Sequence, residues 1–373
     1  MSDTPVTPYE IDVPQSAIAD LQTRLAATRL PDPLPGDDWD TGVPISVLRE
    51  HVARWQEHDW AATQDRLNAL PHFTTTVEDQ VIHFVHVRCT DPDAAPVLLV
   101  HGWPGSFLEF EGLIERLSDS FHLVIPSLPG FGFSTPLTSG GWTSSRIAGA
   151  FVEIMQRLGY DRYVVQGGDL GAGIAPDMGR LAPDAVAGVH VNGALGGFVS
   201  EVDDTSSLTE LEQDRLRRVG EFQEREIGYI SIQSTRPALI GAMAADSPVA
   251  QLAWILDKLH AWTWPADTPA GDVLGDFVLD NVSLYWFTRT AGSAAFVGYA
   301  QGGDWGETPV SSGVPTAAIQ FAHDIGLRSS AEESNRIVRW TDVEDRGGHF
   351  AALEEPDLMV ADLREFIDSM QLL

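Results

Sequence analysis

One stretch of the chain combines three glycines with a single carboxylate in a spacing that suits nucleophilic catalysis. It runs Tyr163-Val164-Val165-Gln166-Gly167-Gly168-Asp169-Leu170-Gly171-Ala172. The apolar run predicts a strand, and the glycines allow a sharp turn into a helix. The small-x-nucleophile-x-small spacing of a nucleophile elbow would place Asp169 at the tip of that turn. The same stretch fits an ordinary turn in which Asp169 caps the helix, so the motif alone leaves both interpretations open.

A carboxylate nucleophile indicates a different substrate from a serine. A carboxylate is suited to displacement at an alkyl carbon, as in an epoxide or a carbon–halogen bond. The carbonyl of the resulting ester belongs to the enzyme. A base-activated water must then hydrolyse that ester while N–H groups stabilise the oxyanion. Asp169 therefore points away from esterases and peptidases.

A second motif, His101-Gly102-Trp103-Pro104, directly follows the apolar run at 96–100. A loop in this place presents a backbone N–H beside the nucleophile, and the residue after the nucleophile supplies another. We therefore expect the N–H groups of Trp103 and Leu170 to form an oxyanion hole. An ordinary Gly/Pro turn with a buried aromatic is the alternative.

The general base and its partner acid are expected late in the chain, in the order nucleophile, acid, histidine. His349 follows two glycines in Arg346-Gly347-Gly348-His349-Phe350, between the last predicted strand and the last helix. Asp324 lies just past the strand predicted at 317–321 and is the favoured acid, since catalytic groups gather at the carboxyl ends of such strands. Asp203 and Asp204 are the fallback, and a solvated loop carboxylate is the alternative for Asp324.

The leaving group separates the two substrate classes. An epoxide oxygen needs an acid such as a Tyr hydroxyl, whereas a halide needs N–H donors. Leu170 offers no side-chain donor, which weakens the dehalogenase hypothesis. Tyr229, Tyr285 and Tyr299 are candidate acids, although each fits a core aromatic equally well.

These residues must be positioned by a sheet with helices on both faces, because predicted strands and helices alternate along much of the chain. We predict an α/β class protein with the α/β-hydrolase fold. Its core comprises 96–197 and 312–373, and residues 1–95 form an N-terminal extension. Residues 198–311 break the alternation and predict a helical lid rich in aromatic side chains. The lid tryptophans include Trp254, Trp262, Trp264 and Trp286.

The amino-acid composition limits which partners the protein can bind. The 373 residues carry a net charge of −31, which disfavours binding to nucleic acid and to anionic membranes. The single cysteine, Cys89, excludes an intramolecular disulfide and suggests a reducing compartment, so we expect a cytoplasmic protein. The N-terminus lacks the pattern of a signal peptide, and no run is apolar for long enough to cross a bilayer. We expect no cofactor and no metal; a homodimer is left open.

In combination, the motifs resemble the microsomal-type epoxide hydrolase family, including its bacterial members, over nearly the whole chain. The stretches that carry the resemblance are His101-Gly102-Trp103-Pro104-Gly105, residues 126–134, Gly167-Gly168-Asp169-Leu170-Gly171, residues 226–237, Asp246-Ser247-Pro248, Leu284-Tyr285-Trp286 and residues 347–356. The N-terminal portion resembles the family's extension at Asp59-Trp60, Leu67-Asn68 and His72-Phe73.

The resemblance implies a cofactor-independent hydrolase that uses water to convert a small epoxide to a vicinal diol. It implies Asp169 as nucleophile, His349 as base, Asp324 as the orienting acid and Tyr229 as an acid in the lid. The aromatic lid favours an apolar, aryl-bearing substrate, and we expect Trp103, Trp286 and Phe350 to line its pocket. A haloalkane- or haloacid-type dehalogenase and a catalytically dead binding protein are the rival hypotheses, but the intact set Asp169, His349 and Asp324 argues against a dead site.

The chain departs from the family's pattern in four places. The aromatic residue that often follows the nucleophile is Leu170 here, and the usual glutamate at the acid position is Asp324. The family's second lid tyrosine falls on Gly298, next to Tyr299, so we expect Tyr299 to serve as the second acid. The family's membrane anchor is absent, which implies a soluble protein.

Overall fold

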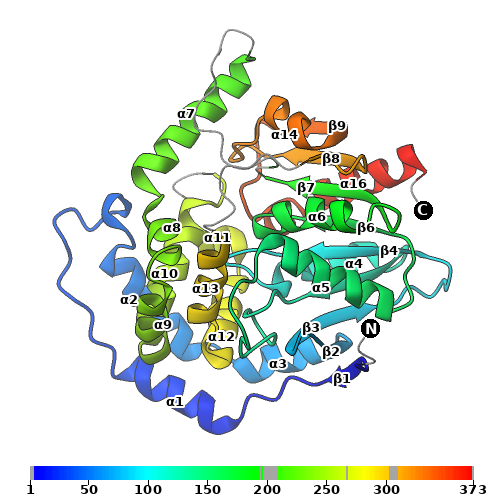
Figure 1. The fold of residues 1–373 in the computed structure, drawn as a ribbon. Helices are drawn as coiled ribbons and strands as arrows, with labels where there is room; N and C mark the ends of the chain where they lie inside the picture. The colour runs from blue at the N-terminus through cyan, green and yellow to red at the C-terminus, as the bar shows by residue number, and fades with distance from the viewer. Residues whose placement is uncertain (1–3, 194, 196–207, 266–267, 302–309, 372–373) are drawn as a thin grey trace.

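The computed structural model describes residues 4–193, 195, 208–265, 268–301 and 310–371. In this part of the chain a nine-stranded sheet has the order β1-β2-β3-β5-β4-β6-β7-β8-β9. Its strands are β1 Thr7–Tyr9, β2 His72–Val77, β3 Gln80–Val87, β4 Ala95–Val100, β5 Phe121–Pro126, β6 Tyr163–Gly167, β7 Val186–Asn192, β8 Pro315–Gln320 and β9 Arg336–Asp342. Figure 1 shows helices on both faces of this sheet and a second group of helices packed beside it.

The central strands are parallel, which brings their carboxyl ends to one edge. β4 pairs in parallel with β5 and β6, and the parallel pairing continues through β7 and β8 to β9. The chain between 97 and 100 is fully buried, as expected for a strand covered on both faces. The helices around it are η2 Phe107–Phe110, α4 Glu111–Leu117, α5 Ser144–Arg157, α6 Leu170–Leu181, α14 Arg328–Ser334, α15 Ala351–Glu354 and α16 Pro356–Met370.

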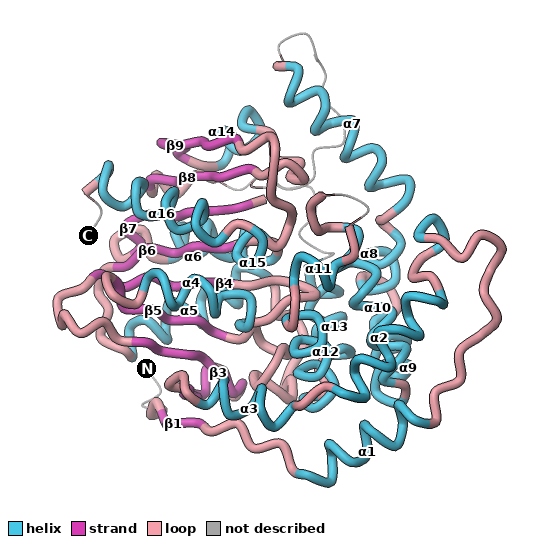
Figure 2. Tube along the Cα trace, turned by 180° about the vertical axis from the view of Figure 1, so that it is seen from behind, coloured by secondary structure: helices cyan, strands magenta, loops and turns pink. Residues whose placement is uncertain are grey.

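The N-terminal portion adds three antiparallel strands and several helices. β1, β2 and β3 join the sheet in succession, and β3 pairs with β5. The helical elements are α1 Gln15–Ala26, η1 Trp39–Thr41, α2 Ile45–Glu57 and α3 Trp60–Asn68. The amide of Asn68 both donates to the backbone oxygen of Ile11 and accepts from its N–H, at 2.9 Å each, which fixes the segment before α1. Figure 2 shows α1 running beneath the lid helices.

Between β7 and β8, helices joined by turns and loops make up the described residues. Its helices are α7 Glu210–Arg225, α8 Gly228–Gln233, α9 Pro237–Asp246, α10 Pro248–Ala261, α11 Ala270–Leu274, α12 Phe277–Thr288 and α13 Ala291–Gln301. Residues 198–207 and 302–309 of the predicted lid lie outside the described residues, and the domain boundaries stay predictions. Trp55 Nε1 donates to Ser283 Oγ at 2.7 Å, which ties α2 to α12.

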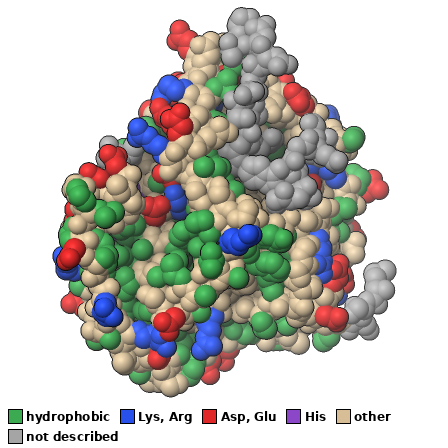
Figure 3. All heavy atoms as spheres, turned by 60° about the vertical axis from the view of Figure 1, so that its left-hand side comes forward, with side chains coloured by type: hydrophobic (Ala, Val, Ile, Leu, Met, Phe, Trp, Pro, Cys, Tyr) green, Lys and Arg blue, Asp and Glu red, His purple; other side chains and the backbone are tan. Residues whose placement is uncertain are grey.

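The outer face of the lid carries hydrophobic side chains, which Figure 3 shows gathered between charged groups. The large exposed ones on the lid helices are Ile232, Leu239, Met243, Phe296 and Tyr299. Within the described ranges, none of the helices is both long and apolar enough to span a membrane.

Candidate active site

Asp169 occupies a strained turn between β6 and α6. Its backbone has φ 53° and ψ −120°, a conformation that non-glycine residues rarely adopt. Its side chain does not cap α6, although Asp169 stands at the N-cap position. A Cβ on Gly102 would lie 2.1 Å from Asp169 Oδ1, and one on Gly171 would lie 2.2 Å from the backbone oxygen of Val100. These two glycines therefore let the loop and the helix close around the carboxylate, which favours the elbow over an ordinary capped turn.

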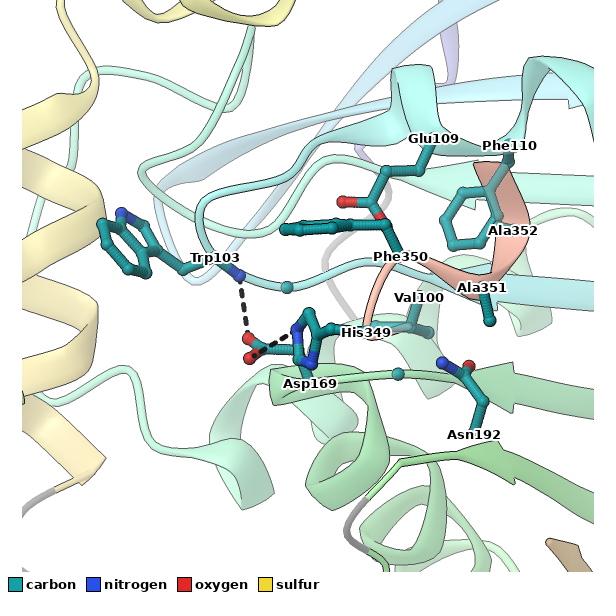
Figure 4. A pocket seen from close by; sticks show the side chains of 12 residues that line it. Val100, Trp103, Glu109, Phe110, Asp169, Asn192, His349, Phe350, Ala351 and Ala352 are labelled. Carbon is teal, nitrogen blue, oxygen red and sulfur yellow. Dashed lines mark hydrogen bonds and ion pairs between the residues drawn. The ribbon is translucent and has the colours of Figure 1, made fainter. Parts of the chain in front are cut away.

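Two backbone donors hold the Asp169 carboxylate. The N–H of Trp103 donates to Asp169 Oδ1 at 2.8 Å, and the N–H of Leu170 also hydrogen-bonds the carboxylate. Figure 4 shows the Trp103 bond together with the contact to His349. The structure thus brings the two predicted oxyanion donors to Asp169.

His101 fixes the peptide group that supplies the Trp103 N–H. Its Nε2 lies 3.2 Å from the N–H of Leu128 and accepts that hydrogen bond, so the ring proton is on Nδ1. Nδ1 then donates to the backbone oxygen of Gly102 at 3.0 Å, the oxygen of the same peptide. Burial lowers the pKa of His101 to about 4, which keeps it neutral for this role.

His349 lies against the other carboxylate oxygen. Its Nε2 is 3.3 Å from Asp169 Oδ2, and its ring packs 4.9 Å from that of Trp262. Burial alone would lower the pKa of His349, but the hydrogen bond and charge of Asp169 outweigh it, with smaller contributions from Asp324 and Glu109. The pKa of His349 is therefore raised.

The pKa of Asp169, in contrast, is lowered. Burial would raise it, but the hydrogen bond and charge of His349 and the backbone donors outweigh burial, so the pKa lies below its usual value. Both shifts favour an ion pair of Asp169 and His349 in the resting site.

Asp324 is buried near His349 but is held by its own turn. Its Oδ2 accepts from the N–H of Phe321 at 2.7 Å. Burial raises the pKa of Asp324 to about 6, while the Phe321 N–H and the charge of His349 oppose that rise. Among the described residues no hydrogen bond joins Asp324 to His349, so the two interact here through charge.

Tyr229, at the start of α8, stacks on the Trp103 ring with centroids 4.9 Å apart and planes 13° from parallel. Burial, Asp169 and Glu226 together hold its pKa well above the usual value, so its hydroxyl stays protonated. Tyr285 is engaged elsewhere, because its hydroxyl donates to the backbone oxygen of Gly105 at 2.9 Å.

Two predicted residues lie away from the Asp169 cavity. Tyr299 is 48% exposed on the outer face of α13, where its ring stacks on Phe296. Trp286 lines a separate cavity between the lid helices, and the Arg24 guanidinium lies over its ring. This arrangement supports neither Tyr299 as second acid nor Trp286 as a pocket residue, because the packing of α12 and α13 turns both side chains elsewhere. The fallback acids Asp203 and Asp204 lie outside the described residues.

A narrow cavity adjoins Asp169 and is partly open to solvent. Phe350 and Trp103, both predicted to line the substrate pocket, are among its lining residues, and His349 and Asn192 contribute polar groups. Figure 4 shows the Glu109 carboxyl directed into it, while the Trp103 ring points away toward the lid. Glu109 was not predicted from the sequence; its only local signal is its place four residues after Gly105, whose missing Cβ leaves room for the carboxyl.

Glu354 is a second carboxyl that the sequence did not single out. Its oxygens accept from the N–H groups of Phe350 at 3.0 Å and Trp264 at 2.8 Å. The N–H of His349 donates to the backbone oxygen of Trp262 at 2.9 Å. The loop that carries the base is thus fastened directly to the lid.

Glu109→Gln is expected to remove a pH-dependent loss of stability. Burial, reinforced by Asp169, raises the pKa of Glu109 from 4.5 to about 8. The unfolded chain releases the Glu109 proton at a lower pH than the folded protein does. Between the two pKa values the unfolded chain therefore binds fewer protons, and the stability of the folded protein falls as the pH rises. Thermal unfolding should show a Tm for the variant roughly 2 °C or more above the unmodified protein near pH 8.5, and little difference near pH 5. A constant difference at both pH values would contradict a protonated Glu109.

No group of three or more His, Cys, Asp or Glu side chains within the described ranges is placed to hold a metal ion.

Comparison with known proteins agrees with this geometry. Residues 6–110 match the family model "Epoxide hydrolase N terminus", and residues 95–259 match the "alpha/beta hydrolase fold" model. Epoxide hydrolase 1 of Sus scrofa is 31% identical and covers 99% of this chain and 90% of its own length. A relative from Stigmatella aurantiaca is 40% identical over 96% of this chain and 84% of its own length.

Solved structures give the same result. The Aspergillus niger epoxide hydrolase superposes with a TM-score of 0.86 at 29% identity, covering 98% of this chain and 97% of its own. The juvenile hormone epoxide hydrolase from the silkworm Bombyx mori has a TM-score of 0.87 at 28% identity, with 99% and 95% covered. The predicted fold is confirmed, and the chain belongs to the epoxide hydrolase family of α/β-hydrolase proteins.

Proposed function

We propose that this protein converts an apolar, aryl-bearing epoxide to a vicinal diol through a covalent ester on Asp169. The observation that carries the proposal is the asymmetry of the Asp169 carboxylate. The Trp103 N–H holds Oδ1, while Oδ2 faces His349 at 3.3 Å. One oxygen is thus prepared to become an oxyanion and the other to attack carbon.

In the first step, Asp169 Oδ2 forms a bond to an epoxide carbon as the carbon–oxygen bond of the ring breaks. The epoxide oxygen takes the hydroxyl proton of Tyr229, whose ring stacks on Trp103 beside the nucleophile. The products of this step are a hydroxyalkyl ester on Asp169 and a phenolate that is later reprotonated.

The same step prepares His349 to act as a base. Asp169 is the largest influence that raises the pKa of His349, and esterification abolishes its negative charge. The pKa of His349 must then fall, so the imidazole gives its proton to solvent and becomes a free base, while solvent returns a proton to the Tyr229 phenolate. Alkylation itself therefore switches His349 from ion-pair partner to base.

In the second step, neutral His349 takes a proton from water while the water oxygen attacks the ester carbonyl of Asp169. The oxyanion develops on Oδ1, within reach of the Trp103 and Leu170 N–H groups. Asp324 stabilises the imidazolium through its charge. Collapse of the intermediate releases the diol oxygen, which takes the proton from His349, and leaves Asp169 as a carboxylic acid. Asp169 then gives its proton to His349, which restores the carboxylate and the protonated imidazole.

Aromatic side chains around Tyr229 support an aryl-bearing substrate. Trp103 contacts Tyr229, Trp254 and Trp262 with ring centroids 4.9, 6.5 and 6.1 Å apart. Such surfaces favour flat apolar groups through burial and ring stacking.

A substrate panel tests the proposal. The purified protein should release diol from styrene oxide and related aryl epoxides, and should release no halide from matched alkyl bromides. Halide release without diol would instead assign a dehalogenase. Saturable binding of aryl epoxides without either product would assign a binding protein.

Tyr229→Phe is expected to slow ester formation about 10²-fold, because the departing oxygen loses its proton donor. Tyr299→Phe is the matched comparison, since it removes the same hydroxyl from the exposed face of α13 and should change the rate by less than about twofold. Rapid-quench mass spectrometry of the alkylated protein measures both rates. A large loss with Tyr299→Phe would restore Tyr299 as an acid despite its position.

A further inference from the structure

A buried lysine lies behind the lid tyrosine. Lys258, on α10, is almost fully buried and forms ion pairs with Glu226, at the C-terminal end of α7, and with Asp257 Oδ2 at 2.9 Å. Figure 1 shows α7, α8 and α10 side by side in the lid. A buried ion pair is weak evidence for stability, because the cost of removing both charges from water offsets their attraction. The position of Lys258 therefore requires another explanation.

Lys258 faces the aromatic cluster at the active site. Its Nζ lies 5.3 Å from the centroid of the Tyr229 ring and 5.9 Å from that of Trp262. Both distances fall within the range of cation–π attraction, which strengthens as the ring gains electron density. A phenol that is giving up its proton gains such density, so the cation favours that state.

The other charges that face Tyr229 are negative. Asp169 and Glu226 both raise the pKa of Tyr229, in addition to the larger effect of burial. Asp169 must be negative to attack, so its effect is unavoidable. Glu226 is different, because its ion pair with Lys258 offsets part of its charge.

We propose that Lys258 is a positioning residue that keeps Tyr229 acidic enough to protonate the epoxide oxygen, by offsetting part of the charge of Glu226 and by placing a cation over the Tyr229 ring. This inference rests on the proposed role of Tyr229. It assigns the Lys258–Glu226 pair to the ester-forming step, and not to hydrolysis of the ester.

The test uses two substitutions that break the same ion pair from opposite sides. Lys258→Met leaves Glu226 uncompensated and should slow ester formation from styrene oxide about tenfold. Glu226→Gln removes the negative charge and keeps the cation, so the rate should be unchanged or faster. Rapid-quench mass spectrometry gives the rates, and circular dichroism and Tm check that both variants fold. If the pair were only structural, both variants would slow ester formation.

A double-mutant cycle identifies the residue through which Lys258 acts. In a Tyr229→Phe background, Lys258→Met should change the rate by less than about twofold, because the phenol that it tunes is gone. An equal tenfold loss in both backgrounds would overturn the inference about Lys258 but would leave the proposed role of Tyr229 as the acid intact. A normal rate for Tyr229→Phe alone would overturn the role of Tyr229 and this inference with it. If Lys258→Met does not fold, a slowed Glu226→Gln still contradicts the proposal.

Discussion

Asp169→Asn should abolish diol formation, with kcat reduced by roughly 10⁴-fold or more. An amide oxygen is a poor nucleophile at an alkyl carbon, and no other carboxylate within the described residues combines two backbone donors with a base. The fold should persist, because the amide oxygen can still accept from the Trp103 N–H. Steady-state diol formation and circular dichroism measure the two effects.

Asp184→Asn is the control for this substitution. Asp184 is exposed after the end of α6, and its replacement should leave kcat unchanged. If Asp169→Asn kept more than a few per cent of the activity, attack by Asp169 would be excluded and a directly activated water would become the better account.

His349→Gln should separate the two chemical steps. Ester formation needs the Asp169 carboxylate and survives the substitution, whereas hydrolysis loses its base and slows roughly 10²–10⁴-fold. The variant should therefore give a burst of epoxide consumption equal to the enzyme concentration, followed by a slow phase. Intact-mass spectrometry should find the protein heavier by one substrate molecule.

Loss of His349 also removes the hydrogen bond and charge that lower the pKa of Asp169. The burst should be measured near pH 8, where Asp169 stays ionised despite that change. If no ester accumulates although kcat falls, His349 acts before or during alkylation, and the division of labour proposed here is wrong.

Local sequence motifs were enough to predict the candidate site residues whose positions are set by the backbone. Asp169, Trp103 and Leu170 lie on turns whose shape is set by neighbouring glycines, so their spacing in the chain fixes their geometry. The parallel order of the sheet then brings the loop of His349 to the same edge. The proximity of Asp169, its backbone donors and His349 could therefore be predicted without knowledge of side-chain packing.

Residues whose roles depend on helix packing were harder to predict. A shift of one position along a helix turns a side chain by about 100°, so the face of α12 or α13 that meets the pocket cannot be read from spacing alone. Trp286 and Tyr299 lie on the other faces. Glu109 and Glu354 are two of 54 acidic residues, and only burial in the folded protein distinguishes them.

A single turnover in ¹⁸O-labelled water tests the covalent ester most directly. With enzyme in excess over styrene oxide, the attacking oxygen comes from Asp169, so the first diol should contain no label from water. The label should instead enter the carboxylate of Asp169, where mass spectrometry of the peptide that contains it would find a gain of one ¹⁸O. Label in the diol from the first turnover, with an unlabelled Asp169, would contradict the ester and require direct attack of water on the epoxide.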